Sequence, residues 1–156
     1  MQKGYPKEII RSLIDGKLAW ETLKEIMSSP KDEDRLKKVT EIEQERVPWE
    51  EKILLPMAEQ LYIVKKGSER IIKCRCGYEY GDYKRNWKLA ALVYERNPQD
   101  GEVYAPQRAC DPEWMALREF YCPRCKAQLE VEAVAPGYPF IMDFEADLEA
   151  IEQMLK

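Results

Sequence analysis

Histidine is absent from this chain of 156 residues, and glycine is scarce, with seven residues. Without histidine there are no Ser-His or Cys-His nucleophile pairs, no histidine-containing metal sites and no imidazole general base. Glycine-rich phosphate-binding loops are missing as well. We therefore expect neither hydrolase activity nor nucleotide chemistry from this chain alone.

Long apolar runs are also missing. Lys7, Arg11 and Lys17 interrupt the apolar opening segment well short of the ~20 apolar residues that span a membrane, and the first residues show no signal-peptide pattern. The chain is 45% hydrophobic and long enough to bury the core of one domain, alone or with an appendage. We expect a globular, cytoplasmic protein with no membrane contact.

Four of the five cysteines form two close pairs, Cys74-Arg75-Cys76-Gly77 and Cys122-Pro123-Arg124-Cys125. Because no histidine is available, these pairs predict an all-sulfur Zn²⁺ site made by Cys74, Cys76, Cys122 and Cys125. A reduced, metal-free core and an iron–sulfur cluster are the alternatives. Four thiolates leave no open coordination position, so such a zinc ion stabilises the fold and activates no water. We expect the site to link the end of a hairpin to the turn after Cys122.

We expect structural roles for the fifth cysteine and for the basic residues near the cysteine pairs. Cys110 is expected to be a free, buried thiol, and a redox or catalytic thiol is the alternative. The net charge is −4, but residues 61–96 carry nine basic and four acidic groups. The basic residues beside the cysteines are expected to offset the charge of about −2 on a zinc ion with four thiolates; they are Lys73, Arg75, Arg124 and Lys126.

Apolar periodicity predicts three helices in the first third of the chain. The first follows Pro6 and ends at Asp15-Gly16, and the second covers residues 18–27. The third is expected to begin at Ser29-Pro30, with Ser29 as the N-cap, and to end before Val47-Pro48. Its apolar stripe is Leu36, Val39 and Ile42.

The rest of the chain contains patterns typical of strands. Residues 61–64 and 71–74 predict a hairpin around Lys66-Gly67-Ser68, and residues 89–94 predict a further strand. A short helix with Trp114 and Leu117 is expected after Asp111-Pro112. Residues 129–133 alternate apolar and acidic side chains, which predicts a strand with Glu130 and Glu132 on its wet face. Leu148, Ile151 and Leu155 predict a closing helix.

These elements predict an α+β fold with three parts. Residues 1–56 are expected to form a helical N-terminal arm, and residues 57–140 a zinc-ribbon-like β domain held by the four cysteines. Residues 141–156 are expected to contain the C-terminal helix.

Two further groups of residues have a functional and a structural interpretation. Tyr78, Tyr80, Tyr83 and Trp87 alternate with Lys84, Arg85 and Lys88. This pattern suits a single-stranded nucleic-acid binder, or rings that cover the metal site and form an interface; interruption by Glu79 and Asp82 favours the second. A further acidic group is expected to form a charged helix surface, rather than a carboxylate metal site or an acid/base site. Its members are Glu41, Glu43, Glu45, Glu50 and Glu51.

Several segments together resemble the small gamma subunit of acetone carboxylase and the related acetophenone carboxylase. They are Glu45-Arg46-Val47-Pro48-Trp49-Glu50-Glu51-Lys52-Ile53-Leu54-Leu55-Pro56, Cys74-Arg75-Cys76-Gly77 through Asp82, Asn86-Trp87-Lys88-Leu89, and Arg118-Glu119-Phe120-Tyr121-Cys122-Pro123-Arg124-Cys125. Ser29-Pro30-Lys31-Asp32, Tyr138-Pro139 and Asp143-Phe144 extend the resemblance over most of the chain.

The resemblance implies a subunit of an ATP-dependent ketone carboxylase, a C–C bond-forming ligase that joins bicarbonate to a ketone enol and yields a β-keto acid. It implies that larger hydantoinase-like subunits use ATP and bicarbonate and form the bond. The small subunit would bind zinc through Cys74, Cys76, Cys122 and Cys125, hold the hetero-oligomer together and carry no catalytic residue.

The substrate and the class of protein have alternatives. The chain ends soon after Leu155 and lacks histidine, whereas acetone-type subunits are longer and contain some, and both departures leave the ketone open. The shorter C-terminus slightly favours an acetophenone-type over an acetone-type enzyme. From another class, a zinc-ribbon nucleic-acid binder or a general assembly protein is the alternative. An independent enzyme would need a chemistry without histidine and without a phosphate loop.

Overall fold

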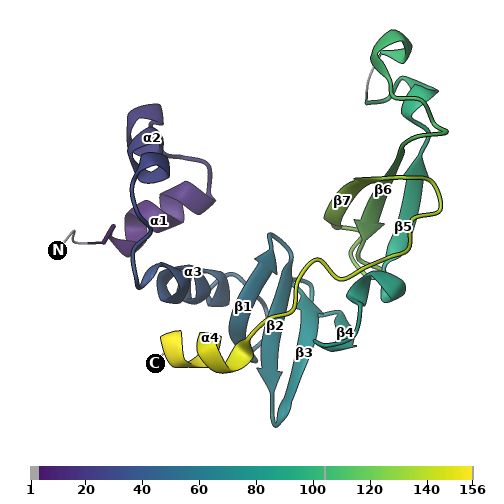
Figure 1. Ribbon diagram of the computed structural model, residues 1–156. Coiled ribbons are helices and arrows are strands. Elements are labelled where there is room, and N and C mark those ends of the chain that lie inside the picture. The colour runs from purple at the N-terminus through teal and green to yellow at the C-terminus, as the bar shows by residue number, and fades with distance from the viewer. Residues whose placement is uncertain (1–3, 104, 156) are drawn as a thin grey trace.

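Three short helices form an N-terminal arm in the computed structural model, which describes residues 4–103 and 105–155 (Figure 1). They are α1 (Lys7–Ile14), α2 (Trp20–Ser28) and α3 (Arg35–Gln44). The first two confirm the predicted helices, and α1 ends at Ile14, with Asp15 as its C-cap before Gly16 at φ +65°. Buried Ile10 and an ion pair of 2.9 Å between Lys7 and Glu41 help to hold α1 on α3.

The predicted start of the third helix is wrong. The helix begins at Arg35, and Ser29 is extended, at φ −100° and ψ 153°. The carboxylate of Asp32 accepts a hydrogen bond of 2.9 Å from the Tyr5 backbone N–H and lies 3.3 Å from the Arg35 guanidinium. Asp32 therefore holds the N-terminal segment against the start of α3.

A four-stranded antiparallel sheet, here called sheet A, follows the arm. Its strands are β1 (Lys52–Ala58), β2 (Leu61–Lys66), β3 (Glu69–Cys74) and β4 (Glu79–Asp82), in the order β1-β2-β3-β4. The predicted hairpin is confirmed, with Gly67 at φ +59° in its turn. Strand β1 begins before the predicted domain boundary at residue 56, so the end of the expected helical arm belongs to the sheet. The three-part division itself stays a prediction.

A second antiparallel sheet, sheet B, has three strands in the order β5-β6-β7. After a 3₁₀ turn η1 (Trp87–Ala90), its strands are β5 (Leu92–Arg96), β6 (Ala116–Tyr121) and β7 (Gln128–Val134). Two more turns, η2 (Pro98–Asp100) and η3 (Pro106–Arg108), lie in the long β5–β6 connection.

The helix predicted after Asp111 is wrong. The Asp111 carboxylate accepts a hydrogen bond of 2.9 Å from the Glu113 backbone N–H, which closes a local turn. Leu117 already lies in β6, paired with Arg96 on one side and Ala133 on the other. Pairing on both sides gives this segment more backbone hydrogen bonds than a single helical turn would.

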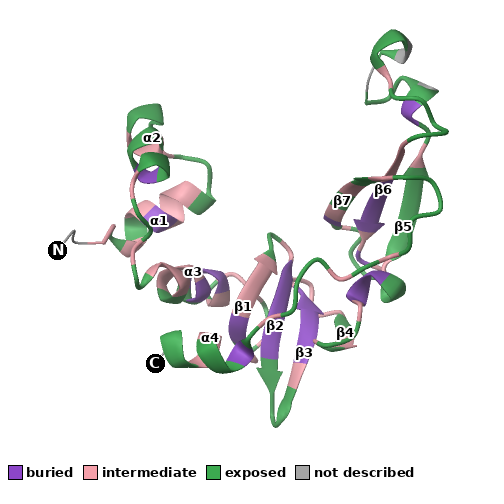
Figure 2. Ribbon diagram, viewed as in Figure 1, coloured by how far each residue is buried: buried purple, intermediate pink, exposed green. Residues whose placement is uncertain are grey.

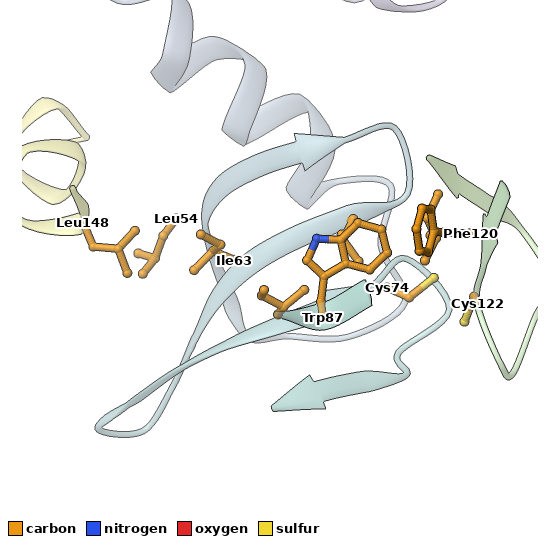
Figure 3. Close-up of a cluster of buried hydrophobic side chains, with 10 residues drawn as sticks. Leu54, Ile63, Cys74, Trp87, Phe120, Cys122 and Leu148 are labelled. Atoms are coloured by element: carbon orange, nitrogen blue, oxygen red, sulfur yellow. The ribbon is translucent and has the colours of Figure 1, made fainter. Parts of the chain in front are cut away.

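Sheet A has a cluster of buried apolar side chains on each face, and most of its buried residues lie in β2 and β3 (Figure 2). Val47 and Trp49, just after α3, pack against a cluster on one face made by Ile53, Tyr62, Val64 and Ile71. A larger cluster extends from the other face to sheet B and to Leu148 of α4 (Leu148–Met154), the predicted closing helix (Figure 3). Its buried members are Leu54, Leu61, Ile63, Ile72, Cys74, Trp87, Phe120, Cys122, Leu129 and Leu148.

The segment between β7 and α4 returns from sheet B across sheet A (Figure 1). The Phe140 ring packs edge-on against Phe120, with centroids 5.4 Å apart, and the Phe140 carbonyl accepts a hydrogen bond of 2.9 Å from the Asn86 side chain. The α+β fold with an N-terminal arm and a C-terminal helix is thus confirmed. Among the described residues, no helix is both long and apolar enough to cross a bilayer.

Candidate metal centre

The four predicted cysteine ligands meet between the two sheets. Their Sγ atoms all lie within 4.8 Å of one another, at 3.8 Å between Cys74 and Cys125 and 3.7 Å between Cys76 and Cys122. These distances are far longer than the ~2.05 Å of a disulfide. Sulfurs bound tetrahedrally at ~2.3 Å from zinc are about 3.8 Å apart. The residues therefore fit a four-coordinate zinc ion.

Two tight turns present the sulfurs. Strand β3 ends at Cys74, whose N–H donates to the Tyr78 carbonyl (2.8 Å) and whose carbonyl accepts from the Gly77 N–H (2.8 Å). Gly77 has φ +92°, which a residue with a side chain rarely adopts. In sheet B, the Lys126 N–H donates to the Cys122 carbonyl (3.0 Å) between β6 and β7. Each turn brings two sulfurs to the same point.

The thiols differ in their acidity. Burial raises the pKa of Cys74 and, to a smaller extent, that of Cys76. Burial acts in the same direction on Cys122, but backbone N–H groups of Cys125 and Arg124 donate toward its sulfur and lower its pKa to about 7. Amide donors that favour a thiolate are what a cysteine ligand requires, because metal binding displaces the thiol proton.

Aromatic rings cover the site, which agrees with the structural interpretation of the aromatic and basic segment. Tyr78, Tyr80 and Trp87 form successive edge-on pairs, with centroids 5.0 and 6.0 Å apart. The Tyr80 hydroxyl is buried and has no hydrogen-bond partner among the described residues. Burial, followed by the neighbouring Cys122 sulfur, raises the pKa of Tyr80. This hydroxyl is an O–H donor suited to a metal-bound thiolate.

The four basic residues near the cysteines were expected to offset the charge of the metal site, and only two of them bond to the ligand turns alone. Lys73 forms an ion pair of 2.6 Å with Glu51, and Arg75 one of 2.9 Å with Glu43, so carboxylates already offset their charges. At the site itself, Arg124 donates to the Cys76 carbonyl (3.2 Å) and the Lys126 ammonium to the Pro123 carbonyl (2.8 Å).

Two other expectations about single residues are wrong. Cys110 is exposed, because it lies in the long connection before β6 rather than in the core. Glu43 is buried rather than part of a charged helix surface, and it accepts a hydrogen bond of 2.7 Å from the Tyr62 hydroxyl. In contrast, Glu41 and Glu45 lie near the surface, where both pair with Lys7.

Three further carboxylates, Glu130, Glu132 and Asp143, gather around the fully buried Lys88. Its ammonium lies 2.7, 3.1 and 2.9 Å from them, in that order. Burial lowers the pKa of Lys88, but the three carboxylates raise it further, so the net shift is upward. The lysine occupies the place that a cation would take, and this cluster is an ion-pair network.

This network corrects the predicted faces of β7. Glu130 and Glu132 point inward to Lys88, whereas Val131 is 50% exposed. Nothing in the sequence distinguished Lys88, as a buried lysine, from its basic neighbours Lys84 and Arg85. Since Lys88 and Trp87 are buried, only part of the supposed nucleic-acid surface is accessible.

A sequence profile described as the acetone carboxylase gamma subunit matches residues 47–156, which is more than half of the chain and includes all four clustered cysteines. The chain belongs to the acetone carboxylase gamma subunit family. It is 42% identical, over 154 residues, to the acetone carboxylase gamma subunit of Xanthobacter autotrophicus, covering 96% of this chain and 92% of that protein.

A second relative of this chain is a subunit of an acetophenone carboxylase. The acetophenone carboxylase beta subunit of Aromatoleum aromaticum is 34% identical over 87 residues, which covers 52% of this chain and 66% of that protein. The resemblance to ketone carboxylase subunits is thereby confirmed, and the chain is a carboxylase subunit by family.

Proposed function

We propose that this protein is a noncatalytic, zinc-binding subunit of an ATP-dependent ketone carboxylase, a ligase that joins bicarbonate to a ketone and forms a β-keto acid. In this proposal, larger hydantoinase-like subunits carry the ATP-dependent chemistry, and the complex is a cytoplasmic hetero-oligomer. The family membership and the relatives' names as subunits support this role.

The observation that carries the zinc proposal is the spacing of four sulfurs from two sheets. Cys74, Cys76, Cys122 and Cys125 would hold the ion. When bound, it would supply a closed, four-coordinate link that adds binding free energy to the folded state. Because the ligands come from segments far apart in sequence, the ion would join the ends of β3 and β6.

The surroundings of the buried charges support a noncatalytic role. Buried Lys88 is paired with three carboxylates, and buried Arg118 lies 2.9 Å from Glu95. Buried Glu119 lies 2.6 Å from Arg96. These charges are paired with oppositely charged side chains, whereas a catalytic acid or base needs access to a substrate.

Exposed apolar side chains on sheet B support a subunit role. Leu92 and Tyr94 on β5 are 44% and 47% exposed, and Val131 on β7 is also exposed. These three side chains belong to one face of the sheet, by the strand register. Apolar side chains gathered on one face are a common property of protein interfaces.

The ketone is the least constrained part of the proposal. The shorter C-terminal region favoured an acetophenone-type enzyme, but the match with the acetone-type subunit is longer and more similar, at 154 residues against 87. The acetophenone preference therefore stays a prediction. Assays of the complete complex with acetone and with acetophenone, each with ATP and bicarbonate, would decide between the two.

The zinc and subunit proposals have a direct test. We expect the purified full chain to bind about one zinc per chain with four sulfur neighbours, measured by elemental analysis and X-ray absorption. We also expect no ATPase or carboxylase activity from the chain alone, and large carboxylase subunits in co-purification from the native host. Zinc with mainly nitrogen or oxygen neighbours, or purification without larger subunits, would contradict the proposal.

A further inference from the structure

Arg75, the single residue between Cys74 and Cys76, is bonded to residues that precede it in the chain through its backbone N–H, its backbone carbonyl and its guanidinium. Its N–H donates to the Gln60 carbonyl (2.9 Å), and its carbonyl accepts from the Trp49 indole N–H (3.0 Å). Its guanidinium donates to a carboxylate oxygen of Glu43 in α3 (2.9 Å) and to the Tyr62 hydroxyl (3.0 and 3.1 Å).

The receiving site for Arg75 is buried. Glu43 is 5% exposed, Tyr62 is fully buried, and the Tyr62 hydroxyl donates in turn to Glu43 at 2.7 Å. Glu43 also pairs with Arg46 at 3.2 Å. A buried carboxylate that loses a partner is strongly destabilised, so the position of Arg75 affects how α3 is held on sheet A.

The turn at the first cysteine pair separates the two sulfurs from the Arg75 guanidinium. The Gly77 N–H donates to the Cys74 carbonyl (2.8 Å), so Arg75 is the second residue of a four-residue turn. The sulfurs of Cys74 and Cys76 lie in the cysteine cluster, whereas the Arg75 guanidinium is bonded to Glu43 and Tyr62. The turn therefore serves two sites at once, the sulfur cluster and the Glu43–Tyr62 pair.

We propose that metal binding by the four cysteines fixes Arg75 and thereby secures helix α3, with the N-terminal arm, on sheet A. Arg75 is the positioning residue in this coupling, which rests on the proposed zinc site. The ion orders the Cys74–Cys76 turn, so Arg75 loses less conformational freedom when it binds Glu43. A neighbouring pair acts in parallel, because Lys73 bonds Glu51 just before β1.

Such coupling is reciprocal. If the metal favours the contact between Arg75 and Glu43, then that contact favours metal binding by the same factor. The prediction is specific, because Glu43 lies on a helix that supplies no ligand. The predicted coupling also differs from a general loss of stability, which would change the free energy of unfolding without changing the metal affinity of the folded chain.

The first test measures zinc affinity in the full chain by competition with a chromogenic chelator. We expect Glu43→Gln, which keeps the shape of the side chain but removes its charge, to weaken zinc binding by about 5-fold or more. Glu41→Gln is the matched control, because Glu41 lies in the same helix and pairs at the surface with Lys7. We expect the control to stay within about 2-fold of the wild type.

The second test measures amide hydrogen exchange with the zinc-loaded full chain. We expect Arg75→Gln to raise exchange in residues 35–44 by about 10-fold, with residues 116–121 unchanged, since a loss of ~1.4 kcal/mol in local stability is tenfold in an opening equilibrium. Arg124→Gln is the control, because Arg124 also lies between two ligands but donates to the Cys76 carbonyl.

The outcomes separate this inference from the proposed zinc site. If the wild-type chain binds no zinc, both are overturned. If zinc binds but Glu43→Gln leaves its affinity unchanged, or Arg75→Gln leaves exchange in α3 unchanged, the coupling is overturned and the zinc site stands. Equal effects of Arg124→Gln and Arg75→Gln on α3 would also overturn the coupling.

Discussion

The two sheets of this protein are stabilised in different ways. Sheet A has an apolar cluster on each face, and most of the side chains in β2 are buried (Figure 2). In sheet B, the buried apolar side chains of the strands are Phe120 and Leu129, and β5 has exposed side chains along most of its length. Sheet B instead carries ion pairs, such as those of Arg118 and Lys88.

This difference indicates that sheet B depends more than sheet A on contacts other than apolar burial within its own strands. Apolar burial contributes about 25 cal/mol per Å², and a sheet with few buried apolar side chains obtains little from it. Sheet B compensates with the contact of Phe120 against Trp87 (5.8 Å), the ion pairs and the cysteine cluster. Removing these supports one at a time should therefore affect sheet B first.

The largest effect is expected from loss of the cysteine cluster. Cys122→Ser, or removal of the proposed zinc ion by a chelator, should raise amide exchange throughout residues 116–134 while β2 and β3 keep most of their protection. The reason is that structural zinc sites contribute up to ~10–16 kcal/mol in small domains with little core. Hydrogen exchange followed by mass spectrometry measures this. Cys110→Ser, at an exposed thiol, should change nothing; simultaneous loss of protection in both sheets would refute the comparison.

The second effect concerns Lys88. Lys88→Met leaves three carboxylates near one another without their cation, and breaking a buried ion pair from one side costs about 3–5 kcal/mol. Urea denaturation of the zinc-loaded chain at neutral pH measures the loss. Lys84→Met, at an exposed lysine nearby, is the control and should cost less than about 0.5 kcal/mol. A loss for Lys88→Met as small as the control's would show that the network contributes little.

A third pair of variants compares apolar burial in the two sheets. Ile63→Ala, at a position 1% exposed in sheet A, should cost about 2–5 kcal/mol because it removes packed methyl groups and leaves a cavity. Val131→Ala, on the exposed face of β7, should change the free energy of unfolding by less than about 0.5 kcal/mol. Thermal and urea unfolding measure both. Similar losses would mean that the exposed face of sheet B is covered in solution.

The smallest effect is a pH dependence within sheet B. Hydrogen bonds from Arg96, and next from Tyr121, hold the pKa of Glu119 below its ordinary value of 4.5. A carboxyl with a lowered folded-state pKa stabilises the fold above its unfolded pKa, and this stabilisation is lost as the pH falls through the folded value. Glu119→Gln should therefore cost about 1–2 kcal/mol at pH 7 and progressively less below pH 4.5.

Glu130 is the matched comparison for this pH series. Burial raises its pKa despite the ammonium of Lys88, so its stability contribution has the opposite sign of pH dependence. Glu130→Gln should cost less at pH 7 than Glu119→Gln. Urea denaturation between pH 3 and pH 8 compares the two, and parallel curves would contradict the assignment.

Local patterns predicted the hairpin and the first and last helices well. In the β2–β3 hairpin, two apolar runs flank Gly67, and this information lies within a few residues. Strand β1 was missed because it contains Pro56, a residue tolerated at the edge of a sheet, and because its pairing with β2 is decided elsewhere in the chain.

The inward direction of Glu130 and Glu132 was not predictable from alternation alone. Alternation shows that β7 has two different faces, but which face is inside depends on what packs there. Lys88 lies 42 and 44 positions away from these carboxylates. The same holds for Glu43, whose partner Arg75 lies 32 positions away.

The sequence by itself determined the chemistry available to this protein: no imidazole, no phosphate loop, four paired cysteines and the segments shared with ketone carboxylase subunits. Residue type and short spacing carry that information. Only the tertiary structure decided that the four sulfurs meet, that Lys88 lies among carboxylates, and that Arg75 points to α3. Those outcomes depend on contacts between distant segments, because burial and charge pairing are settled by the whole fold.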